Sequence, residues 1–292
     1  MCTAVLWSFT SIFFTSASRR IGSYWLNKIR LVLAVAFIST TLMLSTGRLL
    51  PDGIPVESFY YLIASGIVGL TLADSCLFRS FVVIGTRLTL LIFAISPIIA
   101  ALFAWILLDE RLGILAILGI MTTVSGVIWV TVERRHPNSR IDAINGKAKR
   151  IGVLLATGAA TCQAIGLVLA KAGMGESLNP LPATFIRMVA AAVSIWLFGM
   201  LRGDLREIGI KFSDRKALLL ALGGAICGPF LGVWMSLTAV KYTQTGVAMA
   251  IMATVPVLII PLVVIFYKEK ASLRAVIGAI VAVAGVTMLF LE

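Results

Sequence analysis

Long apolar runs separated by short polar or charged stretches make up most of the chain. None of the runs shows the period-two alternation of a membrane β-strand, so continuous hydrophobicity favours helices. A helix needs about 20 apolar residues to cross the hydrocarbon core of a bilayer. The pattern predicts ten membrane-spanning helices, at roughly residues 1–18, 24–46, 58–83, 87–108, 112–132, 151–171, 182–201, 216–240, 245–267 and 272–291.

The composition supports a membrane protein. Hydrophobic residues make up 60% of the 292 residues and charged residues 13%, with a mean hydropathy of +1.03. A soluble domain carries about 25% charged residues, and a water-soluble fold could not cover its surface with so few polar groups. The first run has no basic region before it, so we interpret it as a span and not as a signal peptide. Its shortness fits either a tilted helix or a chain lacking a few N-terminal residues.

Basic residues lie mainly between the apolar runs. The net charge of +12 would suggest nucleic acid in a soluble protein. Here one predicted side of the membrane holds 18 Lys and Arg residues and the other side holds 4. The positive-inside rule then places the richer side in the cytoplasm. We expect a multi-pass protein of the bacterial inner membrane with both termini periplasmic, in contact with the lipid bilayer and with no nucleic-acid partner.

The longest polar stretch, residues 134–150, separates two similar halves, residues 1–133 and 151–292. Arg30 in the first half matches Arg187 in the second. Each half holds five predicted spans, and an odd number makes the second half enter the membrane from the opposite side. Such inverted repeats are typical of secondary transporters, which bind substrate near the midplane between the repeats. Further matches, at a constant offset of 159, are Gly69 with Gly228, Thr86 with Thr245, Pro97 with Pro256, Glu110 with Glu269, Gly119 with Gly278 and Gly126 with Gly285.

Two long stretches resemble the repeat signature of the EamA-type carriers of the drug/metabolite transporter superfamily. The first is "FAISPIIAALFAWILLDERLGILAILGIMTTVSGVIWV", and the second is "AIMATVPVLIIPLVVIFYKEKASLRAVIGAIVAVAGVTMLF". The resemblance implies an all-α membrane protein of ten helices, packed as two inverted five-helix repeats around a central cavity. It also implies transport of amino acids, sugars, other metabolites or drugs. The first half differs from the second at Asp74, Arg79 and Arg87, which match Val233, Thr238 and Gly246 at the same offset.

Polar residues present in only one half are our candidates for substrate binding, because most substrates are not symmetric. Asp74 is the strongest, since a carboxylate at the centre of a membrane helix costs about 2.5–3.5 kcal/mol. It either lines a water-filled cavity, where proton coupling is one role, or belongs to a structural ion pair. Arg79 lies about 140° around the helix from Asp74 and should not pair with it. The remaining candidates are Gln163, Trp7, Phe78 and Trp234.

Residues shared by both halves are expected to be structural. Arg30 and Arg187 would hydrogen-bond carbonyl groups freed near helix ends. Pro97 and Pro256 are candidate hinges at membrane depth. Glu110 and Glu269 occupy charged turns, where we expect a local cap or a salt bridge with a neighbouring base. Arg79 and Arg87 have alternative roles at the membrane interface.

The sequence offers no pattern for a catalytic centre, a cofactor or a metal site. Its single His has no ligand partner at metal spacing, and the four cysteines lie scattered in apolar runs. We therefore predict a secondary transporter that exports a small metabolite, such as an amino acid, by alternating access. The alternatives are a membrane-embedded enzyme and a non-transporting partner or sensor. The substrate, the coupling ion and the oligomeric state stay open.

Overall fold

The computed structural model describes residues 1–51, 53–133, 146–201, 214–267 and 273–291. The regular secondary structure of these residues is helical. In chain order the elements are α1 (Cys2–Ile21), α2 (Ser23–Thr46), α3 (Val56–Gly66), η1 (Ile67–Leu72), α4 (Ala73–Phe93), α5 (Ser96–Leu108), α6 (Ile114–Glu133), α7 (Gly146–Met174), α8 (Pro180–Leu201), α10 (Arg215–Ala225), η4 (Ile226–Gly232), α11 (Val233–Tyr242), α12 (Thr245–Met252), α13 (Val255–Tyr267) and α14 (Leu273–Leu289).

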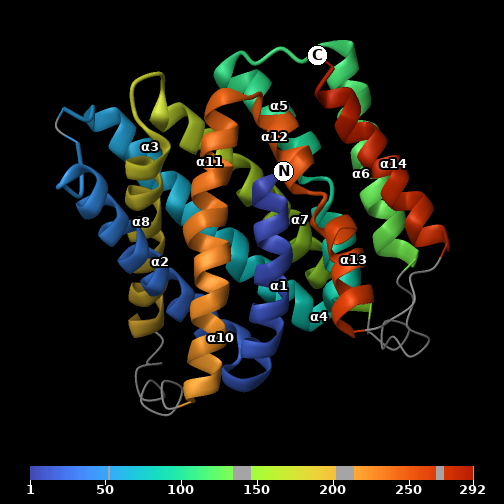
Figure 1. Cartoon of the computed structure of the whole chain (residues 1–292), viewed down its shortest axis with the longest axis horizontal. Helices are drawn as coiled ribbons and strands as arrows, with labels where there is room; N and C mark the ends of the chain where they lie inside the picture. Colours follow the sequence, from blue (N-terminus) through green and yellow to red (C-terminus); the bar gives the residue numbers. More distant parts are fainter. Residues whose placement is uncertain (52, 134–145, 202–213, 268–272, 292) are drawn as a thin grey trace.

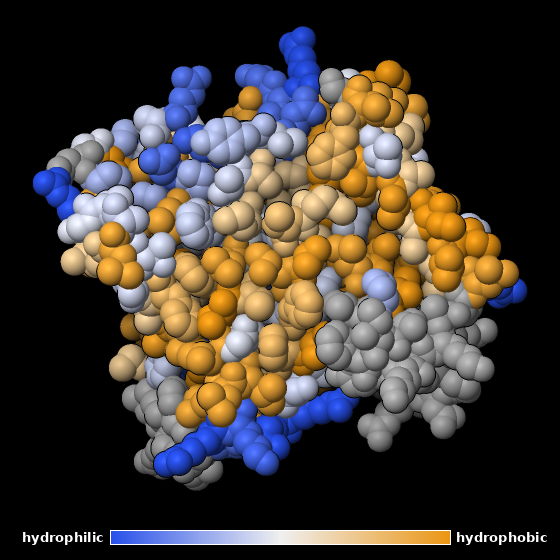
Figure 2. All heavy atoms as spheres, in the orientation of Figure 1, coloured by the Kyte–Doolittle hydropathy of each residue, from blue (hydrophilic) through white to orange (hydrophobic). Residues whose placement is uncertain are grey.

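The helices form a bundle (Figure 1). Figure 2 shows one face of it, with a hydrophobic belt between two polar ends. Large apolar side chains such as Trp105, Leu154 and Leu197 are exposed on this bundle. In water such a surface would drive association, whereas in a bilayer it meets lipid chains.

Seven helical segments of the described residues are long and apolar enough to cross a membrane. They correspond to the second through the eighth predicted spans, and this confirms an all-helical, multi-pass membrane protein. Two further apolar helices, Thr245–Pro261 and Leu273–Leu289, are shorter, and α1 is not among the seven. The full number of ten spans therefore stays a prediction.

Both halves interrupt their helices at equivalent positions. The π-helical turns η1 and η4 begin 159 residues apart, and the helices that follow the next breaks, α5 and α13, begin at Ser96 and Val255. Pro97 and Pro256 are thus the second residues of their helices. Proline has no N–H to donate and is tolerated in the first turn, where that N–H would have no helical acceptor. Between these interruptions Gly85, with φ of 80°, turns the chain within α4.

Each half packs its helices against the other half. The first helix, α1, lies on α10 and η4, while its counterpart α7 lies on α3 and η1. In Figure 1, α6 and α14 lie side by side at the right edge. Glycines allow this close approach: a Cβ on Gly126 would meet Gly278 O at 2.7 Å, and one on Gly119 would meet Gly285 O at 3.1 Å. Small residues at a helix crossing are the usual device for close packing in lipid.

Candidate functional site

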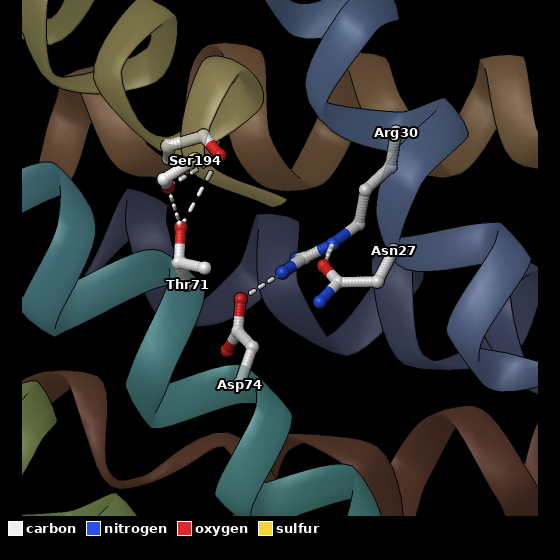
Figure 3. A network of polar contacts seen from close by, with 6 residues as sticks. Asn27, Arg30, Thr71, Asp74 and Ser194 are labelled. Carbon is white, nitrogen blue, oxygen red and sulfur yellow. Dashed lines mark hydrogen bonds and ion pairs between the residues drawn. The ribbon is translucent and has the colours of Figure 1, made fainter. Parts of the chain in front are cut away.

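Asp74 lies in the first turn of α4, directly after the π-helical turn η1. Its carboxylate accepts a hydrogen bond from Arg30 Nη2 of α2 and forms an ion pair with that guanidinium (Figure 3). Arg30 Nε also donates to Asn27 Oδ1 at 2.7 Å, one turn earlier on α2. The side chains of Arg30 and Asp74 keep 13% and 16% of their surface accessible. A charge this deep in the bundle needs a partner, and here each ion has one.

Arg187 of α8 is the second cation near Asp74, and it is 1% exposed. The two charges interact electrostatically. In the part of the chain that the structure describes, however, Arg187 Nε and Nη2 have no hydrogen-bond partner. The guanidinium lies against η1, where a Cβ on Gly69 would be 2.6 Å from Nη2. Glycine at position 69 therefore leaves the space that the guanidinium occupies.

Two hydroxyl groups extend this polar region between η1 and α8. Thr71 Oγ1 lies 2.7 Å from Ser194 Oγ, and both hydroxyls donate to Ala191 O, at 3.2 and 3.0 Å (Figure 3). Ser194 follows Arg187 by seven residues, so the two share one face of α8. We call the following six residues the central polar cluster: Asn27, Arg30, Thr71, Asp74, Arg187 and Ser194.

The equivalent position in the other half is aromatic. Thr71 matches Phe230 at the offset of 159, and Ser194 matches Phe37 at the offset that pairs Arg187 with Arg30. The Phe37 and Phe230 ring centroids lie 5.7 Å apart. One pair of matched positions therefore carries two hydroxyl groups, and the other carries two aromatic rings.

Other aromatic rings surround the ion pair. Arg30 Cζ lies 5.8 Å from the ring centre of Phe14 and 5.9 Å from that of Phe78. Rings at this distance stabilise a guanidinium through cation–π attraction. Trp234 stacks on Phe230 with 6.3 Å between ring centroids. The predicted candidates Asp74 and Phe78 thus meet at Arg30, and Trp234 stacks on the ring pair.

The remaining substrate candidates, as far as the described residues show, make no hydrogen bond or ion pair with this group. Trp7 is half-buried, and its ring faces Gly232, whose added Cβ would be 2.7 Å from Trp7 Cδ1. Gln163 is half-buried on α7. Arg79 is exposed and forms no ion pair with Asp74 among the described residues, as the helical spacing predicts. The side chain of Arg87 lies outside the described residues.

Glu110 makes its contacts with distant segments, whereas the sequence suggested a local partner. Its carboxylate accepts from Thr245 N at 2.7 Å and from Thr245 Oγ1 at 2.9 Å, and it forms an ion pair with Lys171 Nζ at 2.7 Å. Asp109, whose backbone is left-handed, ends α5, and the next residue, Glu110, reaches the N-terminus of α12. There the first N–H groups of a helix lack acceptors and attract a carboxylate. Glu269, its match, lies outside the described residues.

We call Glu110, Lys171 and Thr245 the Glu110 latch, because they join the α5–α6 turn of the first half to α7 and α12 of the second. Two contacts reinforce the latch. Lys171 Nζ donates to Thr243 O at 2.7 Å, and Gln244 Nε2 donates to Arg111 O at 3.0 Å. The latch is thus a set of hydrogen bonds between the two halves of the chain.

Lys28 corrects one detail of the charge count, which included it among the interfacial bases. Its side chain is 0% exposed. The Nζ atom lies 4.5 Å from the ring centre of Tyr24, 4.6 Å from that of Trp25 and 5.3 Å from that of Trp196. Helix packing brings Trp196 of α8 to this lysine, which the sequence could not predict. The charge bias between the two sides remains large without Lys28.

Known proteins resemble this chain in sequence pattern and in fold. The family model of the EamA-like transporter family matches residues 1–132 and 150–291. No curated protein matches the chain. One solved structure, described only as the crystal structure of a protein, aligns with a TM-score of 0.76 at 18% identity. The alignment covers 99% of this chain and 94% of that chain. At this identity the likeness concerns the fold alone.

Proposed function

Because the chain belongs to the EamA-like transporter family, we propose that it is a secondary carrier that moves a small metabolite by alternating access. In this proposal ten spans form two inverted five-helix repeats, residues 1–133 and 151–292. The central polar cluster between them is the substrate site. The direction is export, an amino acid is the first substrate class to test, and Asp74 is the candidate for proton coupling.

The proposal rests on one observation: both halves of the chain contribute residues to the central polar cluster. Asn27, Arg30, Thr71 and Asp74 come from the first half, and Arg187 and Ser194 come from the second. A rocking motion of one half against the other must change the distances within such a group. Alternating access needs this coupling between site geometry and the relative position of the repeats.

Matched interruptions of the helices support the two-repeat arrangement. The equivalent π-helical turns, η1 and η4, pack against the helices of the opposite half, α7 and α1. π-helical turns inside α-helices often mark functional sites. The helix starts at Pro97 and Pro256 add a pair of equivalent interruptions, where proline has no N–H that would need a helical acceptor.

We interpret the Glu110 latch as a contact that closes one end of the bundle in the proposed transport cycle. It joins the halves at the end of the bundle where α5 ends and α12 begins. For transport to proceed, this contact has to break on one step of the cycle and form again on the other. The Glu110 side chain is 12% exposed and the Lys171 side chain is 23% exposed. Water can therefore reach both ions and hydrate them when the contact breaks.

The test is flux into liposomes that contain the purified protein. We expect uptake or counterflow of at least one member of a panel of amino acids, sugars, nucleosides and organic cations, after thermal-shift screening selects the hits. Asp74→Asn should reduce that flux at least tenfold while the protein stays inserted and folded. Arg150→Gln removes an exposed charge from α7 and is the control variant. Flux of Asp74→Asn equal to that of the wild type at several pH values would remove Asp74 from the mechanism.

A further inference from the structure

Arg187 is a buried cation with unsatisfied donors. Its guanidinium is 1% exposed, and Nε and Nη2 have no hydrogen-bond partner within the described residues. Buried guanidinium groups are normally paired with an anion or hydrogen-bonded to carbonyl groups, because the lost hydration must be replaced. Arg187 therefore has at least two N–H donors for a group that the described residues do not provide.

The charges of the central polar cluster do not balance. The cluster holds the two guanidinium groups of Arg30 and Arg187 and the single carboxylate of Asp74. That carboxylate hydrogen-bonds to Arg30. Arg187 interacts with it electrostatically, and Asp74 cannot neutralise both cations. The cluster therefore lacks one negative charge.

The backbone is shaped around the Arg187 guanidinium. A side chain at position 69 would collide with Nη2, at 2.6 Å from the added Cβ, so glycine keeps this place open. Ser194 lies two turns further along the same face of α8, where its hydroxyl meets that of Thr71. Both hydroxyls donate to Ala191 O, so the donors still available on this face are those of the Arg187 guanidinium, a group that recognises oxyanions.

The other side of the pseudo-symmetric centre would suit an apolar body. Phe37 and Phe230 occupy the places of the hydroxyl pair, Trp234 stacks on Phe230, and Val233 occupies the place of Asp74. A ligand lying across the centre would meet a cation and hydroxyls at one end and rings at the other. The ligand that would fit such an arrangement is an amphipathic anion.

We infer that Arg187 binds the oxyanion, a carboxylate or a phosphate, of a small substrate whose apolar part lies toward Phe230 and Trp234. The inference rests on the proposed carrier function and names the substrate class of that same site. The planar guanidinium matches both oxyanions through paired N–H donors. In the state described here the guanidinium is covered, so the anion reaches it when the halves separate around the cluster.

Binding of four small probes to the detergent-purified protein tests this inference. Benzoate and phenyl phosphate carry the two oxyanions on one ring, while benzamide and benzylamine are the neutral and cationic counterparts. We expect benzoate, phenyl phosphate or both to raise the melting temperature and to bind at least tenfold more tightly than the other two. Preference for benzoate identifies a carboxylate substrate, and preference for phenyl phosphate identifies a phosphate. Equal binding of benzamide, or no binding of either anion, would overturn the inference.

Two variants connect the binding to Arg187. Arg187→Met should weaken binding of the preferred anion at least tenfold, whereas Arg150→Met, which removes an exposed arginine from α7, should not change it. Without ligand, Arg187→Met should melt no lower than the wild type, because the substitution removes an uncompensated buried charge. A clearly lower melting temperature would identify Arg187 as structural support and contradict us.

Gly69→Ala provides a second route to the same result. The added methyl group displaces the guanidinium and should weaken anion binding, while Gly158→Ala on α7, where nothing lies within 4 Å of the added Cβ, should not. Unchanged binding by Gly69→Ala would count against the site.

Flux measurements separate the two proposals: anion binding that depends on Arg187 without any flux contradicts the carrier function alone. Flux of a neutral or cationic substrate without anion binding contradicts only the substrate class.

Discussion

Under the proposed alternating-access mechanism, opening the Glu110 latch should shift the protein between two access states. Glu110→Gln keeps the shape of the side chain and an oxygen that can accept from Thr245, but it removes the ion pair with Lys171. Both side chains are mostly buried, at 12% and 23% exposure, and the ions are 2.7 Å apart. Hydrogen bonds to charged groups contribute about 1.5–3 kcal/mol. The equilibrium should therefore move toward the state with a broken latch by roughly 10- to 150-fold, at 1.4 kcal/mol for each factor of ten.

The assay measures the accessibility of the central polar cluster. A single cysteine at position 194 (Ser194→Cys), with the four native cysteines replaced by Ser, is labelled with a membrane-impermeant maleimide in oriented vesicles. When opening limits labelling, the rate from the latch side should rise by about the same factor as the opening equilibrium. Labelling from the opposite side should fall or stay constant.

Matched variants separate the latch from general effects of charge. Glu176→Gln removes an exposed carboxylate from the turn after α7 and should leave the labelling rate unchanged. Lys171→Met should reproduce the effect of Glu110→Gln, and the double variant should add little, because both changes remove one interaction. A labelling rate for Glu110→Gln within twofold of the wild type would refute the idea that this contact holds the halves together.

Three further outcomes can be measured. Asp214 caps α10, and the Ala217 N–H together with Arg20 lowers the pKa of its carboxyl group. The ionised carboxylate should therefore stabilise the folded protein at neutral pH, and this stabilisation should be lost as pH falls through the lowered pKa. The melting-temperature difference between the wild type and Asp214→Ala should accordingly shrink in acid. Gly126→Ala places a methyl group against the α14 backbone and should cost about 1–3 kcal/mol in unfolding measurements, unlike Gly158→Ala. A reporter that fluoresces only in the cytosol should stay dark when fused after the last residue, and a bright fusion would reverse the proposed orientation.

Asp74 is polar in only one half, and the structure gives this residue the Arg30 ion pair and a second cation nearby. Thr71 and Ser194 are also polar in only one half, since their matches are Phe230 and Phe37, but isolated hydroxyl residues are common in apolar helices. The sequence signal was present, but a hydroxyl group costs too little to bury for it to be conspicuous.

Arg30 and Arg187 show where the sequence could not have led to the site. The match between the two arginines predicts a structural role for both, and the sequence gives no reason to treat them differently. Only helix packing distinguishes them: one hydrogen-bonds to Asp74, and the other is left with unsatisfied donors against Gly69. A duplicated residue can thus acquire different partners in the two halves, because only one half carries the carboxylate.

The sequence alone determined the membrane environment, the helical structure and the internal repeat. The physical reason is that lipid offers no hydrogen bonds, so a long apolar run must satisfy its backbone within its own helix. The proline-bearing interruptions follow from local chemistry in the same way. Tertiary structure decided which side chains meet, such as Arg30 with Asp74 and Glu110 with Lys171. Those pairings depend on the rotation and crossing of helices far apart in the chain, and no local pattern of residues encodes them.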